Sequence, residues 1–258
     1  MRAIDEALGL GGETAMFLQA QWPAPKNVKT LISTRLGGVS EGKYQTLNVG
    51  AHVGDDPQCV AENRRRVQAE IALPVAYLNQ THSVDVVQAA ESLHHTPDAD
   101  ASVDSGGGAA CAVMTADCLP VLFCDRAGTV VAAAHAGWRG LAGGVLENTV
   151  AAMQVLPSEI LAYLGPAIGP EAFEVGPEVK EAFCSVRPAA EQAFTGIADG
   201  KYLADIYQLA RLALADVGVS QVFGGEHCTV LERDTFFSYR RDGQTGRMVS
   251  AIWLEPAE

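Results

Sequence analysis

The sequence predicts an α+β fold, or a mixed sheet with helices outside it. Strand-like and helix-like segments are intermixed without the regular strand–helix alternation of a doubly wound parallel sheet. Several predicted strands are joined by short turns, which favours a mixed sheet. No internal repeat or linker divides the 258 residues, so we expect a single domain over residues 1–258.

The predicted strands are short runs that are apolar, or alternate, or are rich in β-branched residues. The segment 28–34 partly alternates and is followed by Gly37 and Gly38. The segments 119–124 and 129–134 resemble buried strands joined by a turn at 125–128. The other predicted strands are 74–78, 84–89, 160–164, 221–224 and 248–254, with a further short apolar run at 111–115.

Four segments favour helix, and one segment favours loop. Asp56 followed by Pro57 is typical of a helix N-terminus and predicts a helix that continues to Ala69. The segment 98–108 is acidic, small and rich in glycine, so we expect a loop there. The other predicted helices are 143–156, which Pro157 ends, 177–184 and 205–217.

Charge and composition exclude several classes of partner. The formal net charge is −13, so the chain as a whole repels nucleic acids and anionic membrane surfaces. A free nucleoside or nucleotide is still acceptable, because one local arginine can override a distant net charge. The first 20 residues do not resemble a secretory signal, and no apolar run is long enough for a membrane span. With six cysteines and no CxxC pair, we expect a cytoplasmic protein with reduced, mostly buried thiols.

Three segments place a metal-competent side chain beside an apolar run and small or turn residues. These side chains are His82, Cys118 and His135. Two imidazoles and a thiolate form a borderline-soft ligand set that suits Zn²⁺, and three protein ligands leave a fourth position open, as in catalytic zinc sites. Zinc would hold Cys118 as a thiolate. The ligand chemistry therefore predicts one catalytic metal ion.

Each of these residues also has a structural interpretation. A histidine beside an apolar strand is usually a satisfied core or surface residue. A cysteine in a reduced protein is usually a small hydrophobic side chain. The three residues lie far apart in sequence and form no compact ligand motif, so the residues alone leave both interpretations open.

Seven short blocks resemble the signatures of the YfiH/laccase-domain family. Their matches run from about Thr30 to Leu254, and the combination is specific. The segment 170–173 departs from the pattern, because many members carry cysteines and a tyrosine there, so no pocket role is transferred to it. The blocks are QTH at 80–82, TADCLP at 115–120, AHAGWRG at 134–140, TRLGGVS at 34–40, ENR at 62–64, GPAIG at 165–169 and FSYRRDG at 237–243.

The resemblance implies a mixed α/β sandwich, a cytoplasmic location and a catalytic zinc held by His82, Cys118 and His135. It implies purine nucleoside phosphorylase activity, with a purine nucleoside and phosphate as substrates. Adenosine deamination and cleavage of methylthioadenosine are implied as further activities. Members of the family have also been described as polyphenol oxidases, and bacterial members have been linked to peptidoglycan precursor editing.

Phosphorolysis requires an anion site for phosphate and a group that eases departure of the base. Arg35 and Arg240 lie in the matched blocks, and a guanidinium offers a planar fork to oxyanions. Asp117, beside Cys118, is a candidate general base or a partner of the metal ligands. The alternatives are structural roles for both arginines and capping of the following turn for Asp117.

We expect structural roles for several other residues in or near the blocks. We expect Asn48 in a turn and Asn63 on a helix surface, rather than as amides that line a pocket. Trp138 either stacks on a base or packs in the core, and the core is favoured. His227 and Cys228 are adjacent in an extended segment, so they face opposite sides and do not share an ion.

A copper-dependent polyphenol oxidase is the second enzymatic interpretation. Two histidines, a cysteine and a weak axial methionine suit blue copper, and Met114 is close to Cys118 in sequence. A laccase also needs a histidine-rich copper cluster. After His82 and His135 only four histidines remain, which are His52, His94, His95 and His227. Oxidation is therefore expected only as an incidental activity of copper-loaded protein.

Two further interpretations stay open. One is a non-catalytic module that binds nucleosides or cell-wall precursors and holds a structural zinc in a closed site with four ligands. The other makes Cys118 a nucleophile with His135 as its base, without metal. Preferred nucleoside and oligomeric state have no signature in the sequence.

Overall fold

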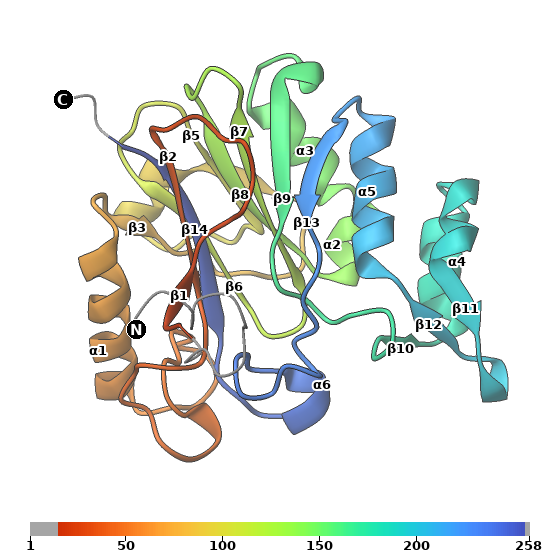
Figure 1. Ribbon diagram of the computed structural model, residues 1–258, viewed down its shortest axis with the longest axis horizontal. Coiled ribbons are helices and arrows are strands. Elements are labelled where there is room, and N and C mark those ends of the chain that lie inside the picture. Colours follow the sequence, from red (N-terminus) through yellow and green to blue (C-terminus); the bar gives the residue numbers. More distant parts are fainter. Residues whose placement is uncertain (1–14, 256–258) are drawn as a thin grey trace, which may run out of the picture.

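Two mixed β-sheets form the centre of the computed structural model, which describes residues 15–255 (Figure 1). The five-stranded sheet has the order β1 (Phe17–Leu18), β2 (Val28–Ser33), β14 (Met248–Leu254), β6 (Ala110–Thr115) and β3 (Val75–Ala76). The six-stranded sheet has the order β13 (Gln221–Gly224), β9 (Ile160–Leu164), β7 (Leu119–Asp125), β8 (Val131–Ala136), β5 (Ala101–Asp104) and β4 (Val86–Gln88).

Both sheets combine parallel and antiparallel pairs. The pairs at three of the four sheet edges, β3–β6, β4–β5 and β13–β9, are parallel, and the edge pair β1–β2 is antiparallel. The inner pairs, among them β7–β8, β7–β9, β2–β14 and β6–β14, are antiparallel. The mixed α+β architecture expected from the sequence is therefore confirmed.

The two sheets pack face to face, and the strands supply side chains to both of their faces. In β7, Leu122 and Cys124 belong to the core cluster between the sheets, where they meet Ile32, Val113 and Ile252 of the other sheet. The alternate residues of β7 belong to a second cluster on the outer face. Because successive side chains point to opposite faces and both faces are buried, these strands are apolar at almost every position.

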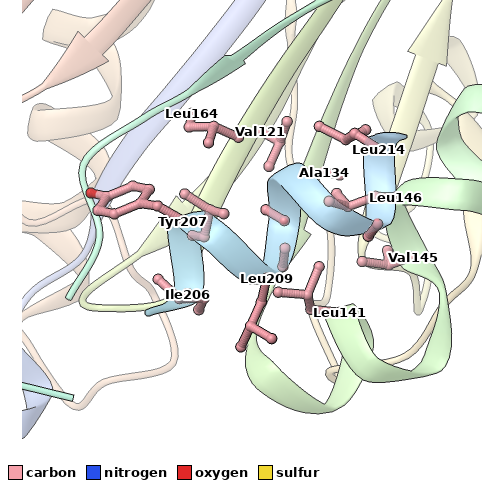
Figure 2. Packing of buried hydrophobic residues seen from close by; sticks show 14 of the residues in the cluster. Val121, Ala134, Leu141, Val145, Leu146, Leu164, Ile206, Tyr207, Leu209 and Leu214 are labelled. Carbon is pink, nitrogen blue, oxygen red and sulfur yellow. The ribbon is translucent and has the colours of Figure 1, made fainter. Parts of the chain in front are cut away.

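Three helices cover the outer face of the six-stranded sheet. They are α2 (Trp138–Gly143), α3 (Val145–Ala152) and α5 (Ile206–Asp216). Figure 2 shows Leu209 and Leu214 of α5 against Leu141, Leu146 and the strand residues beneath them. The outer face of the five-stranded sheet is covered in part by α1 (Pro57–Glu70), whose Val67 is fully buried.

The remaining elements lie beside the sandwich (Figure 1). A small sheet of order β10 (Glu174–Val175), β12 (Tyr202–Ala204) and β11 (Phe194–Gly196) packs with α4 (Pro177–Cys184). The short helix α6 (Tyr239–Asp242) precedes β14. No helix within residues 15–255 combines the length and apolar character that a membrane crossing requires.

Two sequence-based assignments were wrong. The expected loop 98–108 contains β5, a buried strand that pairs with β4 on one side and β8 on the other. The expected helix 143–156 starts at Val145, after Gly144 with its left-handed φ of +103°, and ends at Ala152, and the separate helix α2 before it was not predicted. The strands 28–34, 119–124, 160–164, 221–224 and 248–254, and the helices 57–69, 177–184 and 205–217, agree with observed elements to within two residues.

Candidate metal centre

The β7–β8 hairpin places Cys118 beside the strand that carries His135. Cys118 directly precedes β7, and His135 lies in β8 opposite Pro120. The register continues so that Cys118 lies opposite Gly137. Two of the candidate ligands therefore come from neighbouring positions at one end of a single antiparallel pair.

The third candidate, His82, lies in the loop between β3 and β4, and side-chain contacts hold this loop in place. The Gln80 side chain bonds to both backbone groups of Met114, donating to its carbonyl at 2.8 Å and accepting from its N–H at 2.7 Å. The buried Asp100 carboxylate accepts backbone N–H groups from Thr81, His82 and Ser83 at 3.0, 3.1 and 2.6 Å. His82 itself has a left-handed φ of +62°.

Asp100 also fixes the orientation of His135. Its Oδ1 lies 2.7 Å from Nδ1 of His135, and both side chains are buried. The backbone N–H of His135 donates to the Asp100 carbonyl at 2.7 Å. With Nδ1 engaged by a carboxylate, Nε2 is left to face Cys118 and His82, which is the arrangement common among metal-binding histidines.

The three ligand atoms form a compact group. They all lie within 4.8 Å of one another, and the distance from Cys118 Sγ to His82 Nε2 is 3.8 Å. A tetrahedral zinc ion with sulfur and nitrogen ligands holds its donor atoms roughly 3.5 Å apart. His82 is exposed, Cys118 is half-buried and His135 is buried. The donor set, its spacing and its solvent-facing side fit one ion with a position open to a cavity.

The electrostatics favour the thiolate form of Cys118. Burial opposes its ionisation, but the charge of His135 and hydrogen bonds with His135 and His82 outweigh burial and lower the pKa of Cys118 to about 6. Burial also opposes the charged form of His135, yet the Cys118 charge and the Asp100 hydrogen bond raise the pKa of His135 to about 9. The thiolate is the form that binds metal ions.

Gly137 allows the ligands to come together. A Cβ at this position would lie 2.6 Å from Cδ2 of His82 and 3.2 Å from Sγ of Cys118. At Gly140, a Cβ would lie 2.8 Å from the Ser83 carbonyl oxygen. The glycines of the segment 134–140 therefore let the start of α2 approach the His82 loop and the ligands closely.

A cavity of about 520 Å³ opens on the three ligands, within the range of small-molecule sites. Its lining combines an apolar part with several basic side chains. Beyond the ligands, the lining residues are His52, Gln80, Met114, Thr115, Ala116, Asp117, Trp138, Arg139, Ile168, Phe173, Ile206, Tyr239, Arg240 and Arg247.

Asp117 lies in this lining, but its carboxylate is already engaged. One oxygen accepts the Thr229 hydroxyl at 2.6 Å, and the other accepts the backbone N–H of Arg240 at 2.6 Å. Its carbonyl accepts the N–H of Ile168 at 2.9 Å. Its φ of +100° is rare for a residue other than glycine. These contacts favour a positioning role, in which Asp117 joins three loops just before Cys118.

The two arginines expected to bind phosphate lie in different places. Arg240 lines the cavity, and its guanidinium donates to the Glu174 carbonyl at 2.9 Å. Arg35 is not among the cavity-lining residues: its guanidinium donates to the carbonyls of Gln45 and Arg233 and lies over the Phe237 ring. The structure therefore brings Arg240, but not Arg35, to the ligands, and the contacts of Arg35 favour a structural role.

The polar residues considered structural also have definite contacts. Asn63 was expected on a helix surface, but it is fully buried and binds Val39, Ser40 and the Asn48 carbonyl. A helix pattern does not reveal that a loop covers this face. Trp138 is half-buried against the core and also lines the cavity.

Sequence reasoning missed three contributors to the site. Asp100 lies in the acidic stretch expected to be a loop, and nothing local marks it as the partner of His135. Arg247 follows the last matched block by four residues. His52 was left without a role, although it lines the cavity. The signal that could have identified Arg247 is its own positive charge, close to the matched blocks in an acidic chain.

A family comparison agrees with this architecture. The model of a family described as "Multi-copper polyphenol oxidoreductase laccase" matches residues 29–255. The chain belongs to this family. The resemblance to the YfiH/laccase-domain family is thereby confirmed.

Members of this laccase-domain family with similar sequences include proteins named as phosphorylases. The chain is 59% identical over 236 residues to "Purine nucleoside phosphorylase YfiH" of Escherichia coli, which covers 91% of this chain and 97% of that protein. It is 48% identical over 242 residues to "Purine nucleoside phosphorylase" of Haemophilus influenzae, covering 92% of this chain and 99% of that protein.

Solved structures with similar sequences share the fold. The crystal structure of Neisseria meningitidis protein NMB0706 has a TM-score of 0.93 and 69% identity, and the match covers 94% of this chain and 100% of that chain. The crystal structure of YlmD from Geobacillus stearothermophilus has a TM-score of 0.86 and 32% identity, covering 95% and 98%.

Proposed function

We propose that the protein is a zinc-dependent purine nucleoside phosphorylase, with His82, Cys118 and His135 as the zinc ligands. The observation that carries the proposal is the group of three ligand atoms within 4.8 Å of one another on the wall of a 520 Å³ cavity. The similar proteins of Escherichia coli and Haemophilus influenzae bear the name of this activity.

The reaction transfers the ribosyl group of a purine nucleoside to phosphate. A phosphate oxygen forms a bond to C1′ of the ribose while the bond from C1′ to the purine nitrogen breaks. The bonding electron pair leaves with the purine, which takes up the proton that hydrogen phosphate loses. The products are the free base and ribose 1-phosphate. Bound zinc would supply a Lewis acid that polarises an oxygen ligand.

The protein's own residues supply binding and orientation. Ile168, Phe173 and Ile206 give the cavity an apolar part that suits a purine ring. Arg240 offers guanidinium N–H groups at the cavity, where an oxygen of a substrate can accept them. Asp117 orients Arg240 through its backbone N–H and serves as a partner of the metal centre rather than as a free base.

The decisive experiment combines metal analysis with product detection. The purified protein is expected to contain about one zinc per chain and to convert inosine or adenosine plus phosphate to free base and ribose 1-phosphate. His82→Ala and Cys118→Ala should lose zinc and phosphorolysis together. Full phosphorolysis in both variants would falsify the proposal, and would also discount metal-free catalysis by a Cys118 nucleophile.

Two further activities belong to the same proposal. Methylthioadenosine has the same bond between purine and C1′, so it should be cleaved by the same residues. Adenosine deamination requires a water for attack on the purine ring, and a zinc ion with an open position can lower the pKa of a bound water to about 7. Formation of inosine from adenosine in the absence of phosphate measures this activity separately.

Copper-dependent oxidation remains the second candidate, because the family description names it. Within residues 15–255, one group of three or more His, Cys, Asp or Glu side chains is close enough to hold a metal ion. His52 is the one further histidine in the cavity lining. This ligand supply favours a single ion, whereas a laccase needs several coppers. Polyphenol oxidation by copper-loaded protein, at rates equal to phosphorolysis by zinc-loaded protein, would reverse the ranking.

We also propose that the protein works in a reducing compartment, as expected of a cytoplasmic enzyme. All six cysteines are free thiols in the structure, and Cys111, Cys124 and Cys228 are buried. Oxidising conditions would threaten Cys118, whose thiolate the proposed function requires. Zinc-depleted protein treated with peroxide should therefore recover less activity when zinc is added back, and a thiol reductant given before the zinc should restore it, as far as oxidation stops at the sulfenic acid or a disulfide.

A further inference from the structure

The cavity gathers basic side chains that lack acidic partners. Arg139, Arg240 and Arg247 all line it. Within residues 15–255, none of the three forms a salt bridge, although other arginines do. The chain carries a formal net charge of −13. Cations that stay unpaired in so acidic a protein are placed to meet an anion from outside.

Arg247 is held in place by backbone and side-chain contacts. Its Nη1 donates to the carbonyls of Thr245 and Gly246, both at 3.0 Å, and its backbone N–H donates to Oδ1 of Asn48 at 2.9 Å. Its stem packs against Gly50, where a Cβ would lie 2.8 Å from Cγ of Arg247. The guanidinium is thus fixed by one edge, and its other N–H groups are available to a ligand.

His52 belongs to the loop that holds Arg247. The contact of Arg247 with Asn48 and Gly50 ties the start of β14 to residues 48–52, and His52 lines the same cavity. Burial and the charges of Arg247 and Arg64 lower the pKa of His52. Two nitrogen-bearing side chains from segments far apart in sequence therefore face one space beside the metal ligands.

Arg247 and Phe173 lie beside different residues of α6. The Arg247 guanidinium lies 5.9 Å from the centre of the Tyr239 ring, and that of Arg240 lies 5.8 Å from the centre of the Phe173 ring. Tyr239 and Arg240 are neighbours in α6. Arg247 therefore lies beside Tyr239 while Phe173 lies beside Arg240, so the cavity offers an anion-binding part at Arg247 and a ring-binding part at Phe173.

We propose that Arg247 and His52 form the phosphate site, and that the purine ring of the nucleoside binds at Phe173, Ile168 and Ile206. The proposal deepens the proposed function and rests on it. The ribose then lies near Cys118 and Asp117, between the two parts. Phosphate held by Arg247 supplies the oxygen that bonds to C1′, and the purine leaves towards Phe173 with the electron pair of the broken bond and the proton that phosphate gives up.

The first test compares the Michaelis constants for the two substrates. Arg247→Gln should raise the KM for phosphate about tenfold or more, since a charged hydrogen-bond partner is lost, while the KM for inosine changes less than about twofold. Arg126→Gln is the matched control, because Arg126 is exposed in the β7–β8 turn, away from the cavity lining. Equal rises for both substrates, or an effect confined to Arg240→Gln, would overturn the assignment.

The second test uses wild-type protein, so it does not depend on how Arg247→Gln folds. Inorganic phosphate is titrated into zinc-loaded protein while the histidine ring signals are followed by NMR, with His52→Gln to assign them. The His52 signals should shift, and those of the exposed His94 and His95 should not. No His52 shift at phosphate concentrations that saturate phosphorolysis sinks the proposal.

The two tests separate this proposal from the proposed function. If wild-type protein forms no ribose 1-phosphate, the phosphorylase assignment fails, and a phosphate-dependent His52 shift would still identify an anion site. If ribose 1-phosphate forms but the KM for phosphate is the same in Arg247→Gln and Arg126→Gln, the phosphorylase assignment stands and the phosphate site lies elsewhere.

Discussion

Two residues that are not themselves metal ligands set the geometry of the metal centre. Asp100 binds Nδ1 of His135 and three backbone N–H groups of the His82 loop. Gly137 leaves the space in which His82 and Cys118 approach each other. Both can be changed without removing a ligand, so each gives a test of how the protein builds the site.

Replacing the Asp100 carboxylate should weaken metal binding. Asp100→Asn exchanges one acceptor oxygen for an amide that cannot accept the same N–H groups, so zinc affinity should fall about 10- to 100-fold. Titration with a competing chelator measures this loss. The control is Asp85→Asn, which changes an exposed aspartate close to His82 in sequence. This variant should bind zinc like wild type. Unchanged affinity in Asp100→Asn would contradict the role given to Asp100.

A single methyl group at residue 137 should disturb the ligands. In Gly137→Ala the new Cβ would lie 2.6 Å from the His82 ring, closer than real contacts allow, so His82 must move. We expect loss of most bound zinc with folding retained, measured by elemental analysis and circular dichroism. Gly106→Ala has nothing within 4 Å of its Cβ and serves as the control. Equal zinc contents in the two variants would argue against close packing at the centre.

The low pKa of Cys118 should be visible in its reactivity. In zinc-free protein the alkylation rate of Cys118 by iodoacetamide should rise with pH around pH 6 and level off above it, because only the thiolate reacts. His135→Ala removes the main stabilising charge and should move the midpoint upwards. Peptide mass spectrometry distinguishes Cys118 from Cys111 and Cys124, whose pKa values burial raises to about 12. A midpoint near the ordinary thiol value of about 8.5 would disprove the ion pair.

At the scale of elements, α1 supports the cavity through one buried amide. Asn63 joins α1 to the loop that contains Asn48, and Asn48 in turn binds the backbone of Arg247. Asn63→Ala leaves the Val39 N–H and the Asn48 carbonyl without this partner, so we expect a loss of about 1–3 kcal/mol in unfolding free energy. Urea denaturation measures it against Glu70→Ala, an exposed change on the same helix. Equal midpoints would show that the amide is dispensable.

The elements that the sequence predicted well are those whose signal is local. The strands 119–124 and 160–164 are uninterrupted apolar runs because both of their faces are buried. β5 was missed because its buried status comes from pairing with β4 and β8, while its flanks are acidic and rich in glycine. The short helix α2 was not predicted, because its six residues include two glycines, which do not favour a helix.

The candidate site shows the same contrast between local signals, which the sequence reveals, and long-range contacts, which it does not. His82, Cys118 and His135 were singled out by ligand chemistry and by the resemblance, and the structure brings their ligand atoms together. Asp100 could not be found, because its bond to His135 links residues 35 positions apart and depends on the register of β5 with β8. The position of Arg35 differs from expectation because a motif match does not show which way a guanidinium points.

At the scale of the whole molecule, the strands tie the layers together. β7 and β8 contribute to the cores on both faces of their sheet. Because the same strands contribute to both cores, the two cores should unfold together. We therefore propose that residues 1–258 behave as one domain. Calorimetry should give one transition with equal calorimetric and van't Hoff enthalpies. Two resolved transitions, with or without zinc, would indicate separate units.

The double attachment of Asp100 has a consequence for metal exchange. One carboxylate steers the imidazole in β8 and also pins the amides of residues 81–83. Release of the ion and loosening of that loop are thus energetically linked through a single side chain. Deuterium uptake at these three amides therefore reports the occupancy of the metal site. Uptake should be slow while the ion is bound and faster once the ion has left and His82 can move.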